Sequence, residues 1–294
     1  MTEEGSFIRP GAGSVKGVKW MATPIDKVTT LRVMKKKMRG EKIVCLTAYD
    51  YPFARILDEA GVDIILVGDS VANVVYGMKT TIGIGMEEMV YHTRAVASGV
   101  KRALVVSDMP FLSYQVSLEQ AIENAGRLLK AGAEAVKLEG AGPVLETVRR
   151  LVGCGIPVMG HLGLTPQSVH KLGGYRLQAR RPEEQEKLLT DAQALAAAGC
   201  FAIILEKVPA EAASRVTKAV QIPVIGIGAG PECDGQILVL QDMLGMFEDE
   251  PYKFVKRYAE LNRMTRQAVQ EYVAEVRQGK FPGPEHSFYT DENR

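Results

Sequence analysis

The sequence predicts an α/β fold, a single (β/α)8 barrel, and two observations lead to this prediction. From residue 43 onward, short runs rich in Val, Ile and Leu alternate with longer amphipathic segments. The runs are almost continuously apolar, which is typical of parallel strands that are buried on both faces. Eight such strands with helical crossovers fit a closed barrel at this chain length. We expect strands at 43–50, 64–70, 103–110, 135–140, 157–164, 201–209, 223–230 and 237–245.

Recurring patterns support a series of similar βα units. The segment IPVMGHLG, 156–163, is echoed by IPVIGIGA, 222–229. Between two predicted strands, Ser117 is placed to cap the start of a helix and Gly132 to follow its end. An open doubly wound sheet is the competing architecture. It would more often show a Gly-rich turn after its first strand, where this chain has TAYDYPFA, 47–54.

The chain divides into three regions by composition. Residues 1–25 become rich in Gly and Ser after an acidic start, and we expect a flexible N-terminal tail. Residues 26–250 hold the predicted barrel. Residues 251–294 include a long helical stretch, to about residue 279, that exceeds what one barrel helix needs. We expect this C-terminal extension and its tail to pack on the barrel or on a neighbouring subunit.

Charge and hydropathy exclude several classes of partner. The net charge is +1, so there is no long-range attraction for nucleic acid or an anionic membrane. The basic cluster 35–37 is expected to be a solvated face. No apolar run approaches the roughly 20 residues that a membrane span needs, and the N-terminus lacks the pattern of a secretory signal.

Cysteine usage points to a reducing compartment. The four cysteines are far apart, without a CxxC pair or an adjacent histidine. We interpret them as small buried side chains rather than as disulfide partners or zinc ligands. The expected location is therefore the cytoplasm. They are Cys45, Cys154, Cys200 and Cys233.

Polar side chains stand at the carboxyl ends of five consecutive predicted strands. These are Asp69, Asp108, Glu139, His161 and Glu206, on strands two to six. The carboxyl ends of all strands in a barrel surround one mouth, where active sites lie. Residues that are distant in sequence should therefore meet there. The alternative for each acid is a helix cap or an ion pair with a nearby Lys or Arg.

Carboxylates gathered at one mouth would repel one another unless a positive charge lies among them. Mg²⁺ suits this role, because it prefers oxygen ligands and keeps waters that a substrate can displace. Zinc suits it poorly, since no cluster of His and Cys accompanies the acids. The pattern therefore favours a magnesium site over a zinc site.

Three further side chains suggest chemistry at the same place. Lys137 lies in an apolar strand two positions before Glu139, so both side chains leave the same face. It is either a structural ion-pair partner or a cation for a substrate carboxylate or oxyanion. Glu206 follows FAIIL, and desolvation there would raise its pKa toward that of a general base. His161 either contacts substrate, positions an acid, or is a satisfied core residue.

Specific motifs then identify a known family. From about residue 26 to 289, the chain resembles the ketopantoate hydroxymethyltransferase family. That family adopts a TIM barrel of the phosphoenolpyruvate/pyruvate-enolate superfamily type. The motifs that carry the resemblance are LTAYDYPFA, VGDS, YHTRAV, SDMPF, VKLEG, GHLGLTPQS, LEKVP, IPVIGIGAG and CDGQILV.

The resemblance implies an enzyme of pantothenate and coenzyme A biosynthesis. It would transfer a hydroxymethyl group from 5,10-methylenetetrahydrofolate, the co-substrate, to 3-methyl-2-oxobutanoate. The product would be 2-dehydropantoate (ketopantoate), formed through a Mg²⁺-stabilised enolate. The resemblance also implies one Mg²⁺ per subunit and a homo-oligomer, a decamer in this family. The partners would be small molecules only, a 2-oxo acid and folate.

The family's functional residues carry over to matching positions of this sequence. Asp69, Asp108 and Glu139 look like the metal ligands. Ser70 and Lys137, with Asp69 and Asp108, would bind the 2-oxo acid, and Glu206 would be the catalytic proton acceptor.

Two segments depart from the family pattern. Residues 77–81 read GMKTT, where family members often have Gly-x-Asp-Ser-Thr, and GGYRLQAR, 173–180, places Ala179 where VQGR is more usual. Both departures bear on folate affinity and loop closure more than on the metal chemistry.

Two rival functions remain on the same barrel. The first is a metal-dependent 2-oxo acid C–C lyase or mutase, which commonly carries Lys-Lys-Cys-Gly-His, a motif that this sequence lacks. The second is a catalytically silent barrel that serves as an assembly subunit. It predicts the loss of acids at the mouth, yet all of them are present.

Overall fold

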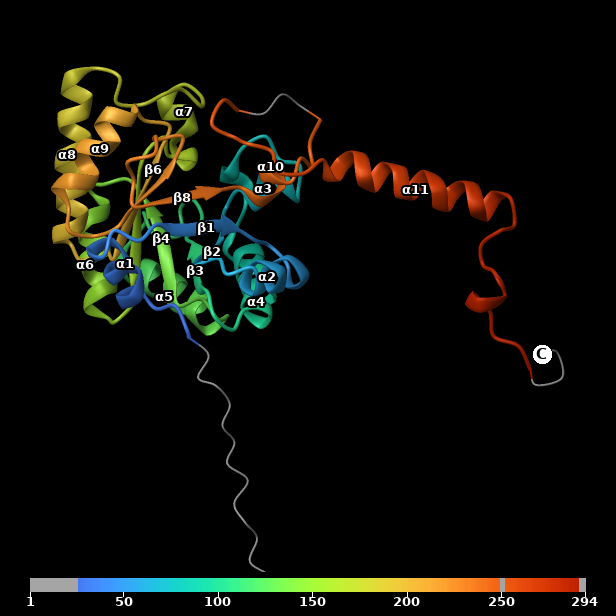
Figure 1. Ribbon diagram of the computed structural model, residues 1–294. Coiled ribbons are helices and arrows are strands. Elements are labelled where there is room, and N and C mark those ends of the chain that lie inside the picture. Colours follow the sequence, from blue (N-terminus) through green and yellow to red (C-terminus); the bar gives the residue numbers. More distant parts are fainter. Residues whose placement is uncertain (1–25, 249–251, 291–294) are drawn as a thin grey trace, which may run out of the picture.

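The computed structural model describes residues 26–248 and 252–290, so the predicted N-terminal tail lies outside the described residues. These residues form the closed parallel barrel that the sequence predicts (Figure 1). The strands follow chain order around the barrel, and β8 closes it by pairing with β1. The strands are β1 Ile43–Thr47, β2 Ile64–Val67, β3 Leu104–Asp108, β4 Ala135–Glu139, β5 Val158–Gly163, β6 Ala202–Glu206, β7 Val224–Ile227 and β8 Gly235–Leu238.

Helices surround the barrel and follow its strands. Ser117 caps α5 as predicted, because its side chain accepts a hydrogen bond from the backbone N–H of Gln120. Within the described ranges, no helix is both long enough and apolar enough to cross a membrane. The α-helices are α1 Thr30–Met38, α2 Tyr51–Glu59, α3 Val71–Val74, α4 Met86–Gly99, α5 Leu118–Lys130, α6 Val144–Gly153, α7 Val169–Leu172, α8 Pro182–Ala197, α9 Ala210–Ala219, α10 Leu240–Met243 and α11 Leu261–Arg277. Three short 3₁₀ turns complete the set, η1 Thr81–Gly83, η2 Pro166–Ser168 and η3 Pro284–His286.

Alternate strand residues build two separate cores. Cys45 and Leu66 belong to a buried cluster inside the barrel. Their neighbours Leu46 and Ile65 belong to a second cluster, between the strands and the helices. Both faces of each strand are therefore apolar, which accounts for the continuous apolar runs in the sequence.

The amino-terminal end of the barrel is closed by α1 and its lysines. Lys36 Nζ lies 2.8 Å from Asp63 Oδ2, and Lys37 Nζ lies 2.9 Å from Asp234 Oδ2. These aspartates directly precede β2 and β8. The prediction of a solvated basic face at 35–37 is therefore wrong for these two lysines, whose charges pair with acids at the strand starts.

The eighth strand lies earlier than the predicted 237–245. It begins at Gly235, where a Cβ atom would lie only 2.4 Å from the carbonyl oxygen of Ile43 on β1. The strand then ends, because the backbone N–H of Leu240 donates to Thr47 Oγ1 at 3.1 Å and the chain turns into α10. The rest of the apolar run is helical and buries Leu240 in the outer core.

The cysteines are free thiols, and three of them are buried as predicted. Cys154 is the exception and is exposed, because it caps the carboxyl end of α6 beyond the buried face of that helix.

The last helix, α11, extends away from the barrel (Figure 1), and none of its residues is buried. It forms a shorter helix than the stretch predicted from residue 251 to about 279, because residues 252–260 form turns and irregular chain. Apolar side chains follow one another at helical spacing along it and are exposed: Met264, Val269, Tyr272, Val273 and Val276.

Ala179, one of the departures from the family pattern, has strained backbone. Its φ is +53°, in the left-handed region, although the residue is buried. The Cβ atom of an L-residue crowds the following carbonyl group in this region, and glycine avoids that contact.

We therefore expect Ala179→Gly to raise the free energy of unfolding by about 1 kcal/mol. Ala194→Gly, inside α8, is the matched control and should lower it by about 0.5–1 kcal/mol, because glycine is disfavoured in helices. Urea unfolding followed by circular dichroism measures both changes. Equal losses in the two variants would contradict the assignment of strain to Ala179.

Candidate functional site

A cavity of about 480 Å³ opens at the carboxyl ends of the strands. The carboxyl ends of barrel strands surround one mouth, so residues far apart in the sequence reach the same space. The structure thus brings the predicted site residues together. The lining includes Asp69, Ser70, Asp108, Lys137, Glu139, His161 and Glu206.

Strand register places four of these side chains. Asp108 on β3 pairs in register with Lys137 on β4, and Glu139 pairs in register with His161 on β5. Lys137 and Glu139 are two residues apart, so both side chains point to the same face of β4. The inward faces of β3, β4, β5 and β6 therefore change from apolar to ionisable side chains at their carboxyl ends.

Asp69 lies just beyond β2, at a turn that requires glycine. A Cβ atom on Gly68 would lie 2.7 Å from Ser70 Oγ. The backbone N–H of Asp69 donates to Asp108 Oδ2 at 2.9 Å, which joins the ends of β2 and β3. Ser70 Oγ lies 2.7 Å from the hydroxyl of Tyr49, which fixes its position in the cavity wall.

Lys137 carries the positive charge nearest to the acids. Its Nζ lies 3.1 Å from Asp108 Oδ1 and 3.8 Å from Glu139 Oε1, and its side chain is 4% exposed. Buried charges at such distances stabilise one another, whereas any one of them alone would be costly. The structural ion pair considered from the sequence is therefore present, and it leaves the ammonium group in the cavity wall.

Gln167 donates hydrogen bonds to two of the acids, Asp69 and Glu139, and the sequence did not predict this role. Its side-chain Nε2 donates to Asp69 Oδ2 at 2.8 Å and to the carbonyl oxygen of Met109 at 2.9 Å. Its backbone N–H donates to Glu139 Oε2 at 3.0 Å, and its Oε1 accepts from the Tyr114 hydroxyl at 2.8 Å. The residue lies in the motif GHLGLTPQS, but a neutral amide in a loop has no charge pattern that would have singled it out.

His161 connects the acid cluster to Glu206. Its Nδ1 lies 3.2 Å from Glu139 Oε1, and its Nε2 lies 3.4 Å from Glu206 Oε2. Glu206 is less buried than its apolar strand suggested, because its side chain is 16% exposed to the cavity. His161 therefore contacts two of the acids, and its role in positioning them stays a prediction.

The pKa values of the three acids in the cluster shift in different directions. Burial, then the charges of Asp108 and Glu139, raises the pKa of Asp69 well above its usual value. Burial also raises the pKa of Asp108, although Lys137 opposes this shift. Burial would raise the pKa of Glu139 too, but its contact with His161 and the charge of Lys137 outweigh burial and lower it.

The acids of the cluster raise the pKa of its two nitrogen bases, whose atoms Lys137 Nζ and His161 Nδ1 lie 3.2 Å apart. Burial lowers the pKa of Lys137, but the charges of Asp108 and Glu139 outweigh it and raise the pKa above the usual value. Burial and the charge of Lys137 lower the pKa of His161. The contacts of His161 with Glu139 and Glu206 outweigh both and raise its pKa to about 9.

The acids also provide oxygen atoms that could hold a cation. Within the described part of the chain, no three His, Cys, Asp or Glu side chains are arranged around a metal position, and Lys137 lies among the acids instead. However, Asp108 Oδ1 and Glu139 Oε1 make no aligned hydrogen bond, and their nearest partners are ion-pair contacts with Lys137 Nζ at 3.1 Å and His161 Nδ1 at 3.2 Å. Hard oxygen donors of this kind fit Mg²⁺. The assignment of Asp69, Asp108 and Glu139 as metal ligands stays a prediction.

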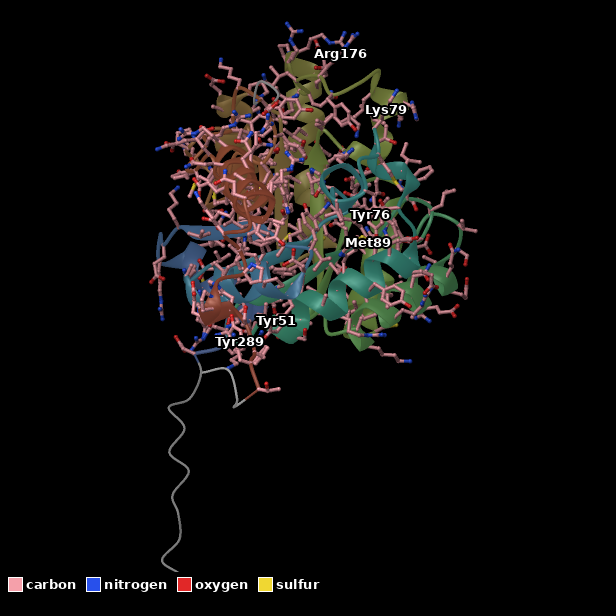
Figure 2. The ribbon with its side chains drawn as sticks, turned by 90° about the vertical axis from the view of Figure 1, so that its right-hand side faces the viewer. Tyr51, Tyr76, Lys79, Met89, Arg176 and Tyr289 are labelled. Atoms are coloured by element: carbon pink, nitrogen blue, oxygen red, sulfur yellow. The ribbon has the colours of Figure 1, made fainter. Side chains whose placement is uncertain are left out.

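The two segments that depart from the family pattern both reach the mouth. Lys79 and Tyr175 line the cavity, and the turns η1 and η2 beside them are in contact. Lys79 and Arg176, one from each segment, lie at the top of Figure 2. Both segments therefore lie at the edge of the cavity and not beside the acid cluster.

Solved structures share this fold at low sequence identity. Phosphonopyruvate hydrolase, in a complex with oxalate and Mg²⁺, has a TM-score of 0.57 and 13% identity over 90% of this chain and 92% of that chain. 2,3-Dimethylmalate lyase, of the phosphoenolpyruvate mutase/isocitrate lyase superfamily, has a TM-score of 0.55 and 15% identity over 87% of this chain and 92% of that chain. At these identities the similarity confirms the predicted barrel fold and no particular activity.

Proteins related to this chain by sequence match it at much higher identity than these solved structures do. The 3-methyl-2-oxobutanoate hydroxymethyltransferase of Syntrophotalea carbinolica is 55% identical over 88% of this chain and 98% of the relative. The proteins of the same name from Caldicellulosiruptor bescii and Moorella thermoacetica are 54% and 56% identical, each over 90% of this chain. The family model for ketopantoate hydroxymethyltransferase matches residues 27–284. The chain therefore belongs to the ketopantoate hydroxymethyltransferase family.

Proposed function

We propose that this chain transfers a hydroxymethyl group from 5,10-methylenetetrahydrofolate to 3-methyl-2-oxobutanoate, which forms 2-dehydropantoate (ketopantoate) for pantothenate and coenzyme A biosynthesis. Family membership supports this reaction, because the relatives named for it align with 88% of this chain or more. The observation in the structure that carries the proposal is the meeting of acids, Lys137, His161 and Glu206 in one cavity.

Asp69, Asp108 and Glu139 are the residues that would hold one Mg²⁺ per subunit. When bound, Mg²⁺ supplies positive charge to the carboxylate and ketone oxygens of a 2-oxo acid, and this acidifies the neighbouring C–H bond. Asp69 Oδ2 and Glu139 Oε2 already accept hydrogen bonds from Gln167. Asp108 Oδ1 and Glu139 Oε1 have ion-pair contacts with Lys137 and His161 but no aligned hydrogen bond, and they are the oxygens that would face the ion.

Lys137 and Ser70 orient the 2-oxo acid beside Asp69 and Asp108. The Lys137 ammonium is buried and fixed by two acids, so it offers a preorganised charge to a substrate carboxylate or a developing oxyanion. Ser70, held by Tyr49, adds a hydroxyl group to the same wall.

Glu206 is the proton acceptor in this proposal. Its carboxylate faces the cavity and remains partly exposed, and its Oε2 lies 3.4 Å from His161 Nε2. This contact with His161 holds the carboxylate in place. Glu206 takes the proton from C3 of the 2-oxo acid, and that carbon then attacks the methylene group of the donor. Water supplies the hydroxyl oxygen, and tetrahydrofolate leaves.

The two rival functions receive less support. The lyases and mutases resemble this chain at the level of the fold alone, at 13–15% identity. A silent barrel has no need for Lys137 and three acids in a cavity wall, because such groups are costly to bury.

Glu206→Gln should lower the rate of C3 exchange by about 10²–10⁴-fold, because the amide cannot accept the proton. The assay follows loss of deuterium from 3-methyl-2-oxobutanoate deuterated at C3, with Mg²⁺ and without folate, by nuclear magnetic resonance. Calorimetry should show that Mg²⁺ and the 2-oxo acid still bind. Glu211→Gln on α9 is the control and should exchange at the wild-type rate. Exchange by Glu206→Gln at that same rate would remove Glu206 from its role, and absence of exchange in the wild-type chain would favour the silent barrel.

Asp108→Asn should weaken Mg²⁺ binding about tenfold or more, because it replaces a charged oxygen ligand by an amide. Isothermal titration with Mg²⁺ alone measures the affinity without any need for turnover. Asp191→Asn, in a surface ion pair on α8, is the control and should bind Mg²⁺ as the wild type does. Equal affinities in all three proteins would contradict the ligand assignment.

The carboxyl-terminal extension is proposed to pack on a neighbouring subunit of a homo-oligomer. In its own chain α11 contacts no core, and its apolar side chains are exposed along one helix. A stripe of this kind is unfavourable in water and marks an interface between proteins. The decamer implied by the family resemblance would provide such a partner, and the setting we propose for the enzyme is the cytoplasm.

The double variant Val269→Glu, Val276→Glu should therefore assemble into smaller species, because charges in an apolar interface are costly. Light scattering after size exclusion measures the mass, and circular dichroism reports whether the barrel is intact. Ala274→Glu, which places a charge on the side of α11 opposite Tyr272, should keep the wild-type mass. A folded double variant of wild-type mass would contradict an interface at α11.

A further inference from the structure

The two halves of the barrel mouth carry different chemistry. The acids, Lys137 and His161 belong to the strands and loops from β2 to β5. The opposite half, after β6 to β8, contributes other groups to the same cavity, among them Lys207, Asp242, Tyr252 and Phe254. The proton removal from the 2-oxo acid proposed above uses none of these four residues.

The cavity is too large for the 2-oxo acid alone. Its volume of about 480 Å³ falls in the range of about 300–1,000 Å³ that accommodates drug-sized ligands. A five-carbon acid held by the inner acids would leave the opposite half of the mouth unfilled. A second, larger ligand has room there.

The opposite half presents two parallel aromatic rings with the ammonium group of Lys207 over them. The rings of Tyr252 and Phe254 are parallel, with an interplanar angle of 1° and centroids 5.6 Å apart. Lys207 Nζ lies 4.8 Å from the centroid of the Tyr252 ring and donates to the carbonyl oxygen of Tyr175 at 2.7 Å. The backbone φ of Lys207 is +45°, in the left-handed region. Strained backbone of this kind collects at ligand sites.

Asp242 is the carboxylate of this half. It lies on α10, just after β8, and its half-buried side chain lines the cavity. Arg257, which lines the same cavity, acts on this carboxylate through its charge. Burial raises the pKa of Asp242, and the charge of Arg257 opposes this shift. A partly desolvated carboxylate gains from a ligand that supplies hydrogen-bond donors to it.

We propose that this half of the cavity is the subsite for the pterin ring of the one-carbon donor. Asp242 accepts hydrogen bonds from the ring, and Tyr252 stacks on its face. The pyrimidinone edge of a reduced pterin carries a ring N–H and an amino group side by side, and a carboxylate accepts from both. Lys207 and Lys79, also at the cavity wall, suit the anionic glutamyl tail of a folate.

This inference rests on the proposed function and extends it to the second substrate. The 2-oxo acid and the donor would occupy opposite halves of one mouth, with Glu206 on β6 at the boundary between them. Two ligands held in one cavity with their reacting carbons facing each other satisfy the proximity that carbon–carbon bond formation requires.

Asp242→Asn tests the subsite, because the amide keeps the shape of the side chain and loses one acceptor oxygen and the charge. The KM for 5,10-methylenetetrahydrofolate should rise about tenfold or more, the loss expected for a hydrogen bond to a charged group. The affinity for tetrahydrofolate, titrated by calorimetry in the presence of Mg²⁺ and the 2-oxo acid, should fall by the same factor. The C3 exchange reaction, which needs no folate, should proceed at the wild-type rate.

Tyr252→Leu is the second variant, and loss of stacking should raise the KM for the donor about fivefold or more. Asp191→Asn on α8 is the matched charge control and should leave the KM for the donor unchanged. An unaltered KM and an unaltered tetrahydrofolate affinity in both mouth variants would overturn the subsite while the proposed function stands. Failure of the wild-type chain to exchange C3 or to form product would overturn the proposed function itself. Loss of exchange in Asp242→Asn would also overturn the subsite, because it would place Asp242 with the 2-oxo acid.

Discussion

The site depends on one arrangement of buried charge. Lys137 lies between Asp108 and Glu139 at the end of the barrel, with Asp69 held beside them. Each of these charges would be costly to bury alone, and together they are compensated by ion pairs and by hydrogen bonds from the backbone and from Gln167. Two of the carboxylate oxygens have ion-pair contacts without an aligned hydrogen bond, Asp108 Oδ1 with Lys137 and Glu139 Oε1 with Lys137 and His161. In the proposed reaction these oxygens serve a cation and an oxygen-rich substrate.

The closed parallel barrel is the scaffold that holds these charged side chains in fixed positions. Strand register fixes Asp108 opposite Lys137 and Glu139 opposite His161. Below this layer the inward side chains are apolar and tightly packed. At the other end, Lys36 and Lys37 tie α1 to acids at the strand starts. The stable end and the reactive end of the barrel are therefore separated by an apolar core, so the loops at the mouth vary without disturbing the core.

A single mouth serves two substrates in the proposed reaction, and its two halves differ accordingly. One half offers hard oxygen donors and a buried ammonium, which suit a small 2-oxo acid. The other offers aromatic faces, Lys207 and Asp242, which suit a flat heterocycle with an anionic tail. The departures at Lys79 and Ala179 lie in segments that border this mouth. They adjust the surroundings of the site and leave its acid cluster intact.

The sequence by itself determined the barrel and the strand ends that carry Asp108, Glu139 and Glu206, and it left Lys137 as either an ion-pair partner of the acids or a cation for the substrate. The strand features follow from local rules: apolar runs mark buried strands, and a period of two sets the face of each side chain. Tertiary structure alone decided that Gln167 contacts Asp69 and Glu139, that Asp242 lines the cavity, and that Lys36 and Lys37 pair with distant aspartates. It also decided that β8 starts at Gly235, where β1 comes too close for a side chain. These features depend on which segments meet in space, and an isolated amide in a 3₁₀ turn or an isolated acid in a short helix carries no periodic signal of its partners.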